Sequence, residues 1–174
     1  IYTPDREALF ARICGYFERS GFTIVEAKIH TTRNGYALDT FMVMGTGSGA
    51  HYREMIALIE NELGAELQSQ APLGPPGSGR VSRRVRHFPI PPAVDIRPDE
   101  RGVYHSLNIV ASDRPGLLYR VARRLARYQL NLHSAKISTL GDRAEDVFLV
   151  SGAALADSKA VLKLEQELLA ELQI

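Results

Sequence analysis

One short stretch of the chain carries the residue types that a small polar ligand requires. Asp113-Arg114-Pro115-Gly116 follows an apolar run, Tyr104–Ala111, and precedes an amphipathic helix. Asp is a common N-cap, Pro suits the first helical turn, and Gly allows a ligand to approach closely. A helix N-terminus at the end of a strand presents free N–H groups, which bind anions. The stretch therefore predicts an anion-binding loop.

Signals for catalysis are weaker. Gly45-Thr46-Gly47-Ser48-Gly49 is rich in glycine but lacks the Gly-Lys-Ser/Thr ending of a phosphate loop, so Ser48 is interpreted as a helix N-cap. The chain has neither an Asp-x-Asp pair nor a His-Asp dipeptide for metal-assisted chemistry. Its five histidines show no metal-ligand spacing, and the single Cys14 excludes a disulfide framework. We expect no catalytic residues, no metal site and no cofactor in this chain.

The chain contains an internal repeat, which indicates what must position the loop. A shift of 108 positions places Asp113-Arg114 on Asp5-Arg6, with one residue dropped in the later hairpin. Further matches are Leu9 with Leu117, Arg12 with Arg120, Ile13 with Val121, Ala27-Lys28-Ile29 with Ala135-Lys136-Ile137, Thr31 with Thr139, and Asp39, Phe41, Val43 and Gly45 with Asp146, Phe148, Val150 and Gly152. Because order and spacing persist, we interpret the chain as a tandem duplication.

Each copy has the pattern strand, helix, strand, strand, helix. In the first copy we expect these elements at Ile1–Thr3, Asp5–Ser20, Phe22–Thr32, Tyr36–Met44 and near His51–Leu63. In the second they are Tyr104–Ala111, the helix opened by Asp113, Leu130–Leu140, Ala144–Gly152 and a helix near Ser158–Leu172. The predicted class is α+β: two tandem ferredoxin-like βαββαβ units, with antiparallel sheets and helices on one face.

The last strand of each unit is missing from its expected place. We expect Ala93–Arg97 to pair antiparallel with the strand that ends at Ala111, and the first unit to take its last strand from Val85–Ile90. The predicted units are 1–92, whose first strand is truncated and which includes a flexible loop at 68–80 and a basic linker, and 93–174.

Composition limits the class of protein. The chain has 174 residues, 45% of them apolar and 24% charged, with a net charge of +1. This balance is typical of globular proteins and gives no general attraction to nucleic acid or membranes. Without a long apolar run or a signal peptide, a cytoplasmic location is expected. Because the chain begins at Ile1 within an apparent strand, we expect it to be a fragment of a longer protein.

Two motifs in this order resemble a known family. Asp-Arg-Pro-Gly-Leu-Leu after a strand, followed by Leu130-Asn131-Leu132, resembles the ACT domain, a ferredoxin-like module that binds amino acids at interfaces. Arg86-His87-Phe88-Pro89-Ile90-Pro91 between the copies, together with Ala135–Phe148, resembles the C-terminal region of the bacterial bifunctional PII uridylyltransferase/uridylyl-removing enzyme family.

That resemblance implies a regulatory region of a larger enzyme. It would sense glutamine, act on the catalytic domains of the parent chain and so control nitrogen assimilation. The parent would use Mg and UTP to uridylylate the PII protein and would also remove the group. The resemblance implies no nucleic-acid or membrane partner for this region, and it leaves ACT–ACT self-association open.

The resemblance also places the amino acid at the strand–helix loop. The expected ligand-binding residues are Ser112, Asp113, Arg114, Gly116, Leu117, Leu118 and Asn131. Backbone N–H groups of 116–118 would hold the α-carboxylate, Asp113 would pair with the α-ammonium, and the Asn131 amide would donate and accept. In the first copy Glu7-Ala8 replaces Pro-Gly and Thr23 replaces Asn131, so the second copy is the expected binding face.

Other interpretations remain open. The chain would fit a tandem-ACT regulator of another kind, or a docking or oligomerisation module without a ligand. An RNA-binding sheet would need paired aromatics, and the strand that contains Phe148 offers one. Asp5 and Asp113 would also serve as plain N-caps, and Arg120, Arg123, Arg124 and Arg127 would form an exposed helix face.

Overall fold

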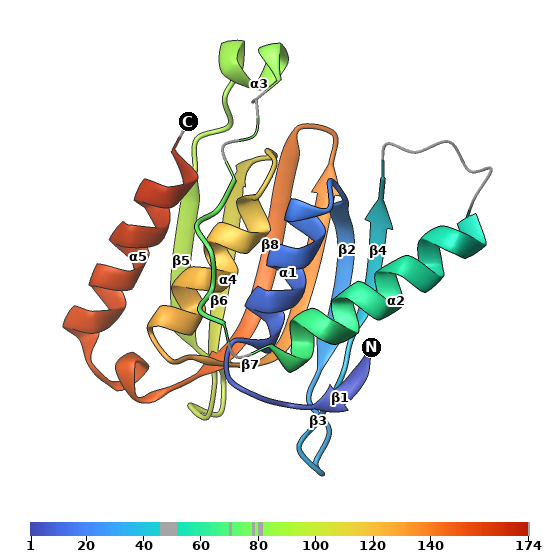
Figure 1. Cartoon of the computed structure of the whole chain (residues 1–174). Helices are drawn as coiled ribbons and strands as arrows, with labels where there is room; N and C mark the ends of the chain where they lie inside the picture. Colours follow the sequence, from blue (N-terminus) through green and yellow to red (C-terminus); the bar gives the residue numbers. More distant parts are fainter. Residues whose placement is uncertain (46–51, 70, 78, 80–81, 174) are drawn as a thin grey trace.

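The computed structural model describes the chain except for residues 46–51, 70, 78, 80–81 and 174 (Figure 1). Ser48 therefore lies outside the described residues. The elements of the first copy are β1 (Tyr2–Pro4), α1 (Leu9–Arg19), β2 (Thr23–His30), β3 (Tyr36–Leu38), β4 (Thr40–Met44) and α2 (Tyr52–Gln68). The remaining elements are α3 (Arg83–His87), β5 (Ala93–Pro98), β6 (His105–Ser112), α4 (Leu117–Arg127), β7 (Asn131–Leu140), β8 (Arg143–Ser151), a 3-10 helix (Ala153–Ala156) and α5 (Ser158–Leu172).

Both copies contribute to one antiparallel sheet. Its strand order is β4-β2-β7-β8-β6-β5, while β1 and β3 form a separate two-stranded sheet. Helices α1, α2, α4 and α5 lie on one face of the six-stranded sheet (Figure 1). The predicted α+β class, with antiparallel strands and helices on one face, is confirmed.

The copies meet along an approximate twofold axis. Strand β2 of the first copy pairs antiparallel with β7 of the second, and Lys28 lies opposite its own repeat equivalent, Lys136. Helices α1 and α4 pack against each other above these strands. A Cβ atom on Gly15 of α1 would lie 2.7 Å from the Tyr119 ring of α4, so a side chain there would push the helices apart. The first and second copies thus share a seam of two strands and two helices.

The segment between the copies differs from the predicted strand at Val85–Ile90. Residues Arg83–His87 form the short helix α3, whose N-cap is Ser82. The Ser82 hydroxyl accepts a hydrogen bond from the Val85 N–H at 3.1 Å. The prolines that follow lack the N–H groups that a strand needs, so the predicted strand is wrong. Strand β5 pairs antiparallel with β6, from Ala93 opposite Val110 to Pro98 opposite His105.

Helices α1 and α4 begin later than the aspartates predicted to cap them. The residue before each helix, Ala8 or Gly116, has a left-handed backbone with φ 58° or 76°. The Asp113 N–H instead donates to the Asp142 carbonyl in the β7–β8 turn at 2.8 Å. The N-cap interpretation of Asp5 and Asp113 is therefore wrong, because each precedes a turn that carries the chain into the helix.

One hydrophobic core crosses the boundary between the copies. Phe10 and Ala27 of the first copy belong to the same buried cluster as Leu107 and Phe148 of the second. A smaller cluster under α2 includes Leu63 and Leu67, and the helix continues beyond its predicted end at Leu63. Among the described residues, no helix is both long and apolar enough to cross a membrane.

Candidate functional site

Two cavities lie at opposite ends of the α1–α4 seam. Each combines the strand–helix loop of one copy with the beginning of a sheet strand from the other copy. We name them the Asp146 pocket and the Asp39 pocket after a buried carboxylate in each. Each cavity combines both copies because the approximate twofold axis brings the start of β2 to one loop and the start of β7 to the other.

The Asp146 pocket has a volume of about 320 Å³. The loop that leads into α4 forms one wall, and the beginning of β2 forms another. Its lining residues are Cys14, Glu18, Gly21, Phe22, Thr23, Ile24, Asp113, Arg114, Pro115, Gly116, Leu117, Leu118, Tyr119, Ile137, Thr139, Ala144 and Asp146. The volume is at the lower end of the range for small-molecule sites and suits a ligand of amino-acid size.

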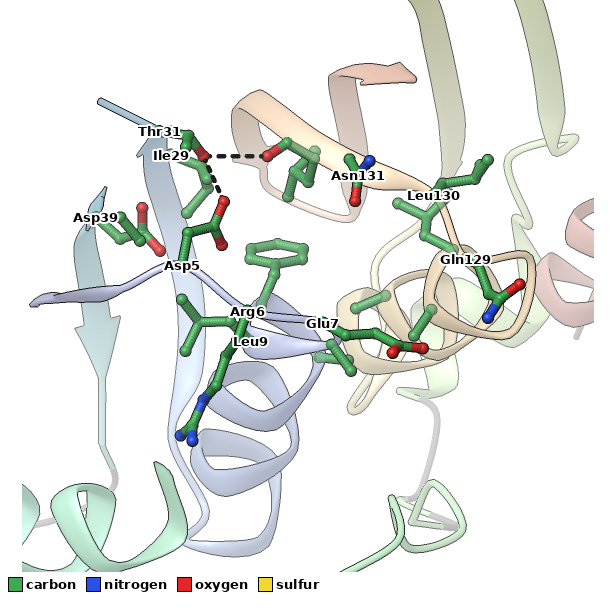
Figure 2. A pocket seen from close by; sticks show the side chains of 18 residues that line it. Asp5, Arg6, Glu7, Leu9, Ile29, Thr31, Asp39, Gln129, Leu130 and Asn131 are labelled. Atoms are coloured by element: carbon green, nitrogen blue, oxygen red, sulfur yellow. Dashed lines mark hydrogen bonds between the residues drawn. The ribbon is translucent and has the colours of Figure 1, made fainter. Parts of the chain in front are cut away.

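The Asp39 pocket is about 330 Å³ in volume. Figure 2 shows Asp5 and Glu7, from the loop before α1, and Asn131, at the start of β7. The Thr31 hydroxyl donates to the Asp5 carboxylate at 3.0 Å and lies 3.5 Å from the Leu132 carbonyl (Figure 2). Its loop contains Ala8 where the other pocket has Gly116.

The structure divides the predicted ligand-binding residues between these places. The residues that line the Asp146 pocket are Asp113, Arg114, Gly116, Leu117 and Leu118. Asn131 lines the Asp39 pocket. Helix α4, with 11 residues, separates Asn131 from the loop of its own copy by about 16 Å. Asn131 therefore cannot contact a single amino acid together with Asp113, because the ligand is too short.

Ser112 lines neither cavity. It is 2% exposed, and its hydroxyl accepts a hydrogen bond from the Ile90 N–H at 2.7 Å. This bond fastens the segment before β5 to the end of β6. Ser112 thus has a structural partner in the place where the sequence analysis expected a ligand.

The loop donors of the Asp146 pocket are partly engaged. The Leu117 N–H donates to the Arg114 carbonyl at 3.1 Å. The Arg114 N–H donates to the Asp113 carboxylate, and the Gly116 and Leu118 N–H groups have no carbonyl partner among the described residues. The Arg114 guanidinium donates to the carbonyls of Gln173 and Glu171 at the end of α5. Arg114 is therefore held by α5, and the N–H groups are the better candidates for binding a carboxylate.

Each pocket contains a buried aspartate that the sequence analysis aligned but did not assign to a site. Asp39 and Asp146 are repeat equivalents, and each is 2% exposed. One carboxylate oxygen of Asp146 accepts from the Ser138 N–H at 3.3 Å, and Asp39 accepts from the His30 N–H at 3.4 Å. Burial raises the pKa of Asp146 to about 7 and that of Asp39 to about 6.

A detectable signal for these aspartates exists in the sequence. In β8 the buried positions alternate, and Asp146 occurs between the buried Ala144 and Phe148. An aspartate on the apolar side of a strand is costly unless it has a partner or a function. The same residue at the equivalent place in the first copy makes an accidental occurrence less plausible.

Described residues of the segment between the copies make hydrogen bonds to α1 and α4, at side chains that line the Asp146 pocket. The Tyr119 hydroxyl donates to the Gly74 carbonyl at 2.9 Å, and the Gly77 N–H donates to a Glu18 oxygen at 2.9 Å. The other Glu18 oxygen is buried and has no partner among the described residues. Glu18 therefore links this segment to the wall of the Asp146 pocket.

The arginines of α4 differ from the predicted exposed face. The Arg124 side chain is 15% exposed and pairs with Glu167 at 2.7 Å and Glu171 at 2.6 Å, both on α5. Arg120 is also only partly exposed and lies 3.5 Å from Glu171. The interpretation of an exposed face is wrong for these two residues, which join α4 to α5. No group of three His, Cys, Asp or Glu side chains in the described part of the chain is placed to hold a metal ion.

Comparisons with known proteins identify relatives of this chain. Residues 105–170, from the start of β6 into α5, match the ACT domain family, so the second copy contains an ACT domain. The whole chain is 56% identical over 178 residues to a bifunctional uridylyltransferase/uridylyl-removing enzyme of Cupriavidus pinatubonensis, of which it covers 20%. It is 56% identical to the enzyme of that name from Ralstonia nicotianae, covering 21% of it, and 51% identical to that of Aromatoleum aromaticum, covering 20%.

Over its whole length the chain is thus similar to one part of these enzymes, and it spans about a fifth of the length of the curated relatives. In each of these three comparisons the similarity covers 100% of the chain. No solved structure is similar enough to the chain to count as a match.

Proposed function

We propose that the chain is the amino-acid-sensing regulatory region of a uridylyltransferase/uridylyl-removing enzyme, with glutamine as its ligand. The relatives carry that enzyme name, and the second copy contains an ACT domain. Catalytic domains of the parent chain would use Mg and UTP to modify the PII protein in the cytoplasm. This region would bias them between addition and removal of the uridylyl group, and so control nitrogen assimilation.

The observation that carries the proposal is the composition of the two cavities. Each is lined by a loop from one copy and a strand from the other. A ligand that contacts both copies binds one relative arrangement of them better than another, and it shifts the equilibrium toward that arrangement. By linkage, the same free energy is available to any domain that contacts the pair.

We assign the α-carboxylate of the ligand to the loop of the Asp146 pocket. The Gly116 and Leu118 N–H groups lie where the partial positive charge of the α4 N-terminus is concentrated. The Asp113 carboxylate lines the same pocket, and it would receive the α-ammonium. These assignments need no movement of Arg114, whose guanidinium is engaged with α5.

Calorimetric titration with glutamine tests the proposal. Saturable binding to the 174-residue chain is expected, and it should weaken at least tenfold in Asp113→Ala, because the ammonium loses its carboxylate partner. Glu100→Ala, in a turn remote from both cavities, is a matched control. If neither glutamine nor any other amino acid bound, the sensing function would be refuted and a docking module without a ligand would be favoured.

A further inference from the structure

Acidic side chains outnumber basic ones in the lining of both cavities. Three carboxylates and one arginine line the Asp146 pocket, namely Glu18, Asp113, Asp146 and Arg114. The Asp39 pocket has the same count, with Asp5, Glu7, Asp39 and Arg6. In Figure 2 the Arg6 side chain extends away from Asp5 and Asp39. An amino acid with an acidic side chain would therefore add negative charge to a site that already has an excess of it.

Asp146 lies further along the sheet than the loop that would hold the α-carboxylate. Ser112, the residue before Asp113, pairs with Arg143 at the start of β8. Asp146 is three residues further along that strand, about 10 Å at the rise of a β-strand. A ligand anchored by its backbone groups at the loop would point its side chain along the sheet toward Asp146.

The Asp146 carboxylate has capacity for a ligand. The structure shows one hydrogen bond to it, the long one from the Ser138 N–H at 3.3 Å. An ionised carboxylate accepts on both oxygens, so a second oxygen is available on a side chain that is 98% buried and lines the cavity. A buried acceptor of this kind is stabilised by a donor from the ligand and is destabilised by another carboxylate.

We propose that Asp146 is the specificity-determining residue of this site, which accepts a hydrogen bond from the side-chain NH₂ of glutamine and rejects glutamate by charge repulsion. The inference rests on the proposed function, because it takes the ligand to be an amino acid held by its α-groups at the loop. It assigns to Asp146 a role distinct from that of Asp113, which contacts the α-ammonium.

The protonation state of Asp146 makes the selection dependent on pH. Other ionisable groups around the pocket are Glu18 and Cys14 on α1, Tyr119 on α4, and Asp113 and Arg114 on the loop. The neighbouring β7 residues that line the pocket, Ile137 and Thr139, do not titrate. Because the pKa of Asp146 is raised to about 7, the carboxyl is mostly ionised at pH 8 and mostly protonated at pH 6.

Glutamate and glutamine should respond differently to this titration. A protonated Asp146 can donate to the side-chain carboxylate of glutamate, whereas an ionised one repels it. The protonated fraction rises roughly tenfold from pH 8 to pH 6, so glutamate should bind roughly tenfold more tightly at pH 6. Glutamine can offer either its NH₂ or its carbonyl, so its affinity should change much less.

The deciding experiment is a titration of the 174-residue chain with glutamine and with glutamate at pH 6, 7 and 8. Wild type should select glutamine more strongly as the pH rises. In Asp146→Asn the selectivity should fall at least tenfold at pH 8 and lose its dependence on pH, because the amide can donate to glutamate. The Asn oxygen can still accept from Ser138, so the variant retains the structural contact.

Glu145→Gln is the matched control. It makes the same change in charge one position away, on the opposite side of β8, where the side chain is 58% exposed. It should leave selectivity unchanged. If Asp146→Asn bound glutamine and glutamate with the wild-type ratio, the inference would be wrong while amino-acid sensing would stand. If Asp146→Asn did not fold, the dependence of glutamate affinity on pH in wild type would decide, and its absence would overturn the inference.

Discussion

Asp146→Asn should also change the stability of the ligand-free chain in a direction set by the raised pKa. An acid whose pKa is higher in the folded state than in the unfolded state binds its proton more tightly when folded. Ionisation therefore adds no penalty below the unfolded pKa, near 4, and the folded state loses stability progressively as the pH rises from there through about 7. The free energy of unfolding of wild type should fall over this pH range, and the fall that is due to Asp146 should be absent from the variant.

The size of the effect follows from the shift. The pKa of Asp146 rises from 3.8 to about 7, and each unit corresponds to about 1.4 kcal/mol. Integrated between pH 5 and pH 8, this gives a change of about 2.5 kcal/mol in the difference between the two proteins. At pH 8 the variant should be more stable than wild type. The cost of burying its amide reduces this gain.

Urea unfolding followed by circular dichroism at pH 5, 6, 7 and 8 measures this difference. Asp39 titrates in a similar range with a pKa of about 6, so absolute stability is less informative than the difference between wild type and Asp146→Asn at each pH. Glu145→Gln, on the exposed side of β8, should follow wild type. A difference that stayed constant from pH 5 to pH 8 would show that Asp146 is ionised normally and would refute the reasoning.

Three other perturbations have expected outcomes. Ala8→Gly should stabilise the chain by about 1 kcal/mol in thermal unfolding, because Ala8 has a left-handed backbone. Gly116→Ala should destabilise it by at least as much, because Gly116 is also left-handed and an added Cβ would require the Glu18 carboxylate to move. Arg124→Ala should cost about 1–3 kcal/mol in urea unfolding, since Glu167 and Glu171 lose their short contacts and keep only the longer ones, to Lys163 at 4.0 Å and to Arg120 at 3.5 Å. Glu18→Ala should speed proteolytic cleavage between the copies, because the Gly77 N–H loses its acceptor; an unchanged cleavage rate would show that this bond does not hold the segment.

The internal repeat allowed the order of strands and helices in each copy to be predicted. Apolar periodicity located the last helix at Ser158–Leu172, where the structure has it. It could not show that α1 and α4 begin at Leu9 and Leu117, because a turn with a left-handed residue is not distinguished from a cap by residue type alone. The prolines near α3 argued against a central strand, but a cap by Ser82 was not anticipated.

A single sequence could not show which residues of the other copy complete each cavity. Asn131 and Asp113 are close in the chain and lie at opposite ends of one helix, which the helix length alone would have indicated. Their true neighbours, however, come from the other copy, and they depend on the pairing of β2 with β7. Strand pairing between repeats is set by tertiary packing, for which hydrophobic alternation gives no register. The sequence shows Asp146 as a polar residue on the apolar side of a strand, but it does not show that a cavity lies beside it.

The pairing of β2 with β7 means that two modules which would otherwise meet by diffusion are covalently fused. Their association is intramolecular, so dilution cannot separate the walls of either cavity. In a symmetric dimer of identical chains, each substitution would appear in both sites at once. Fusion removes that constraint. One half has kept Gly116 beside Thr23 and the other Ala8 beside Asn131, so the two cavities have been free to acquire unequal affinities within a single polypeptide.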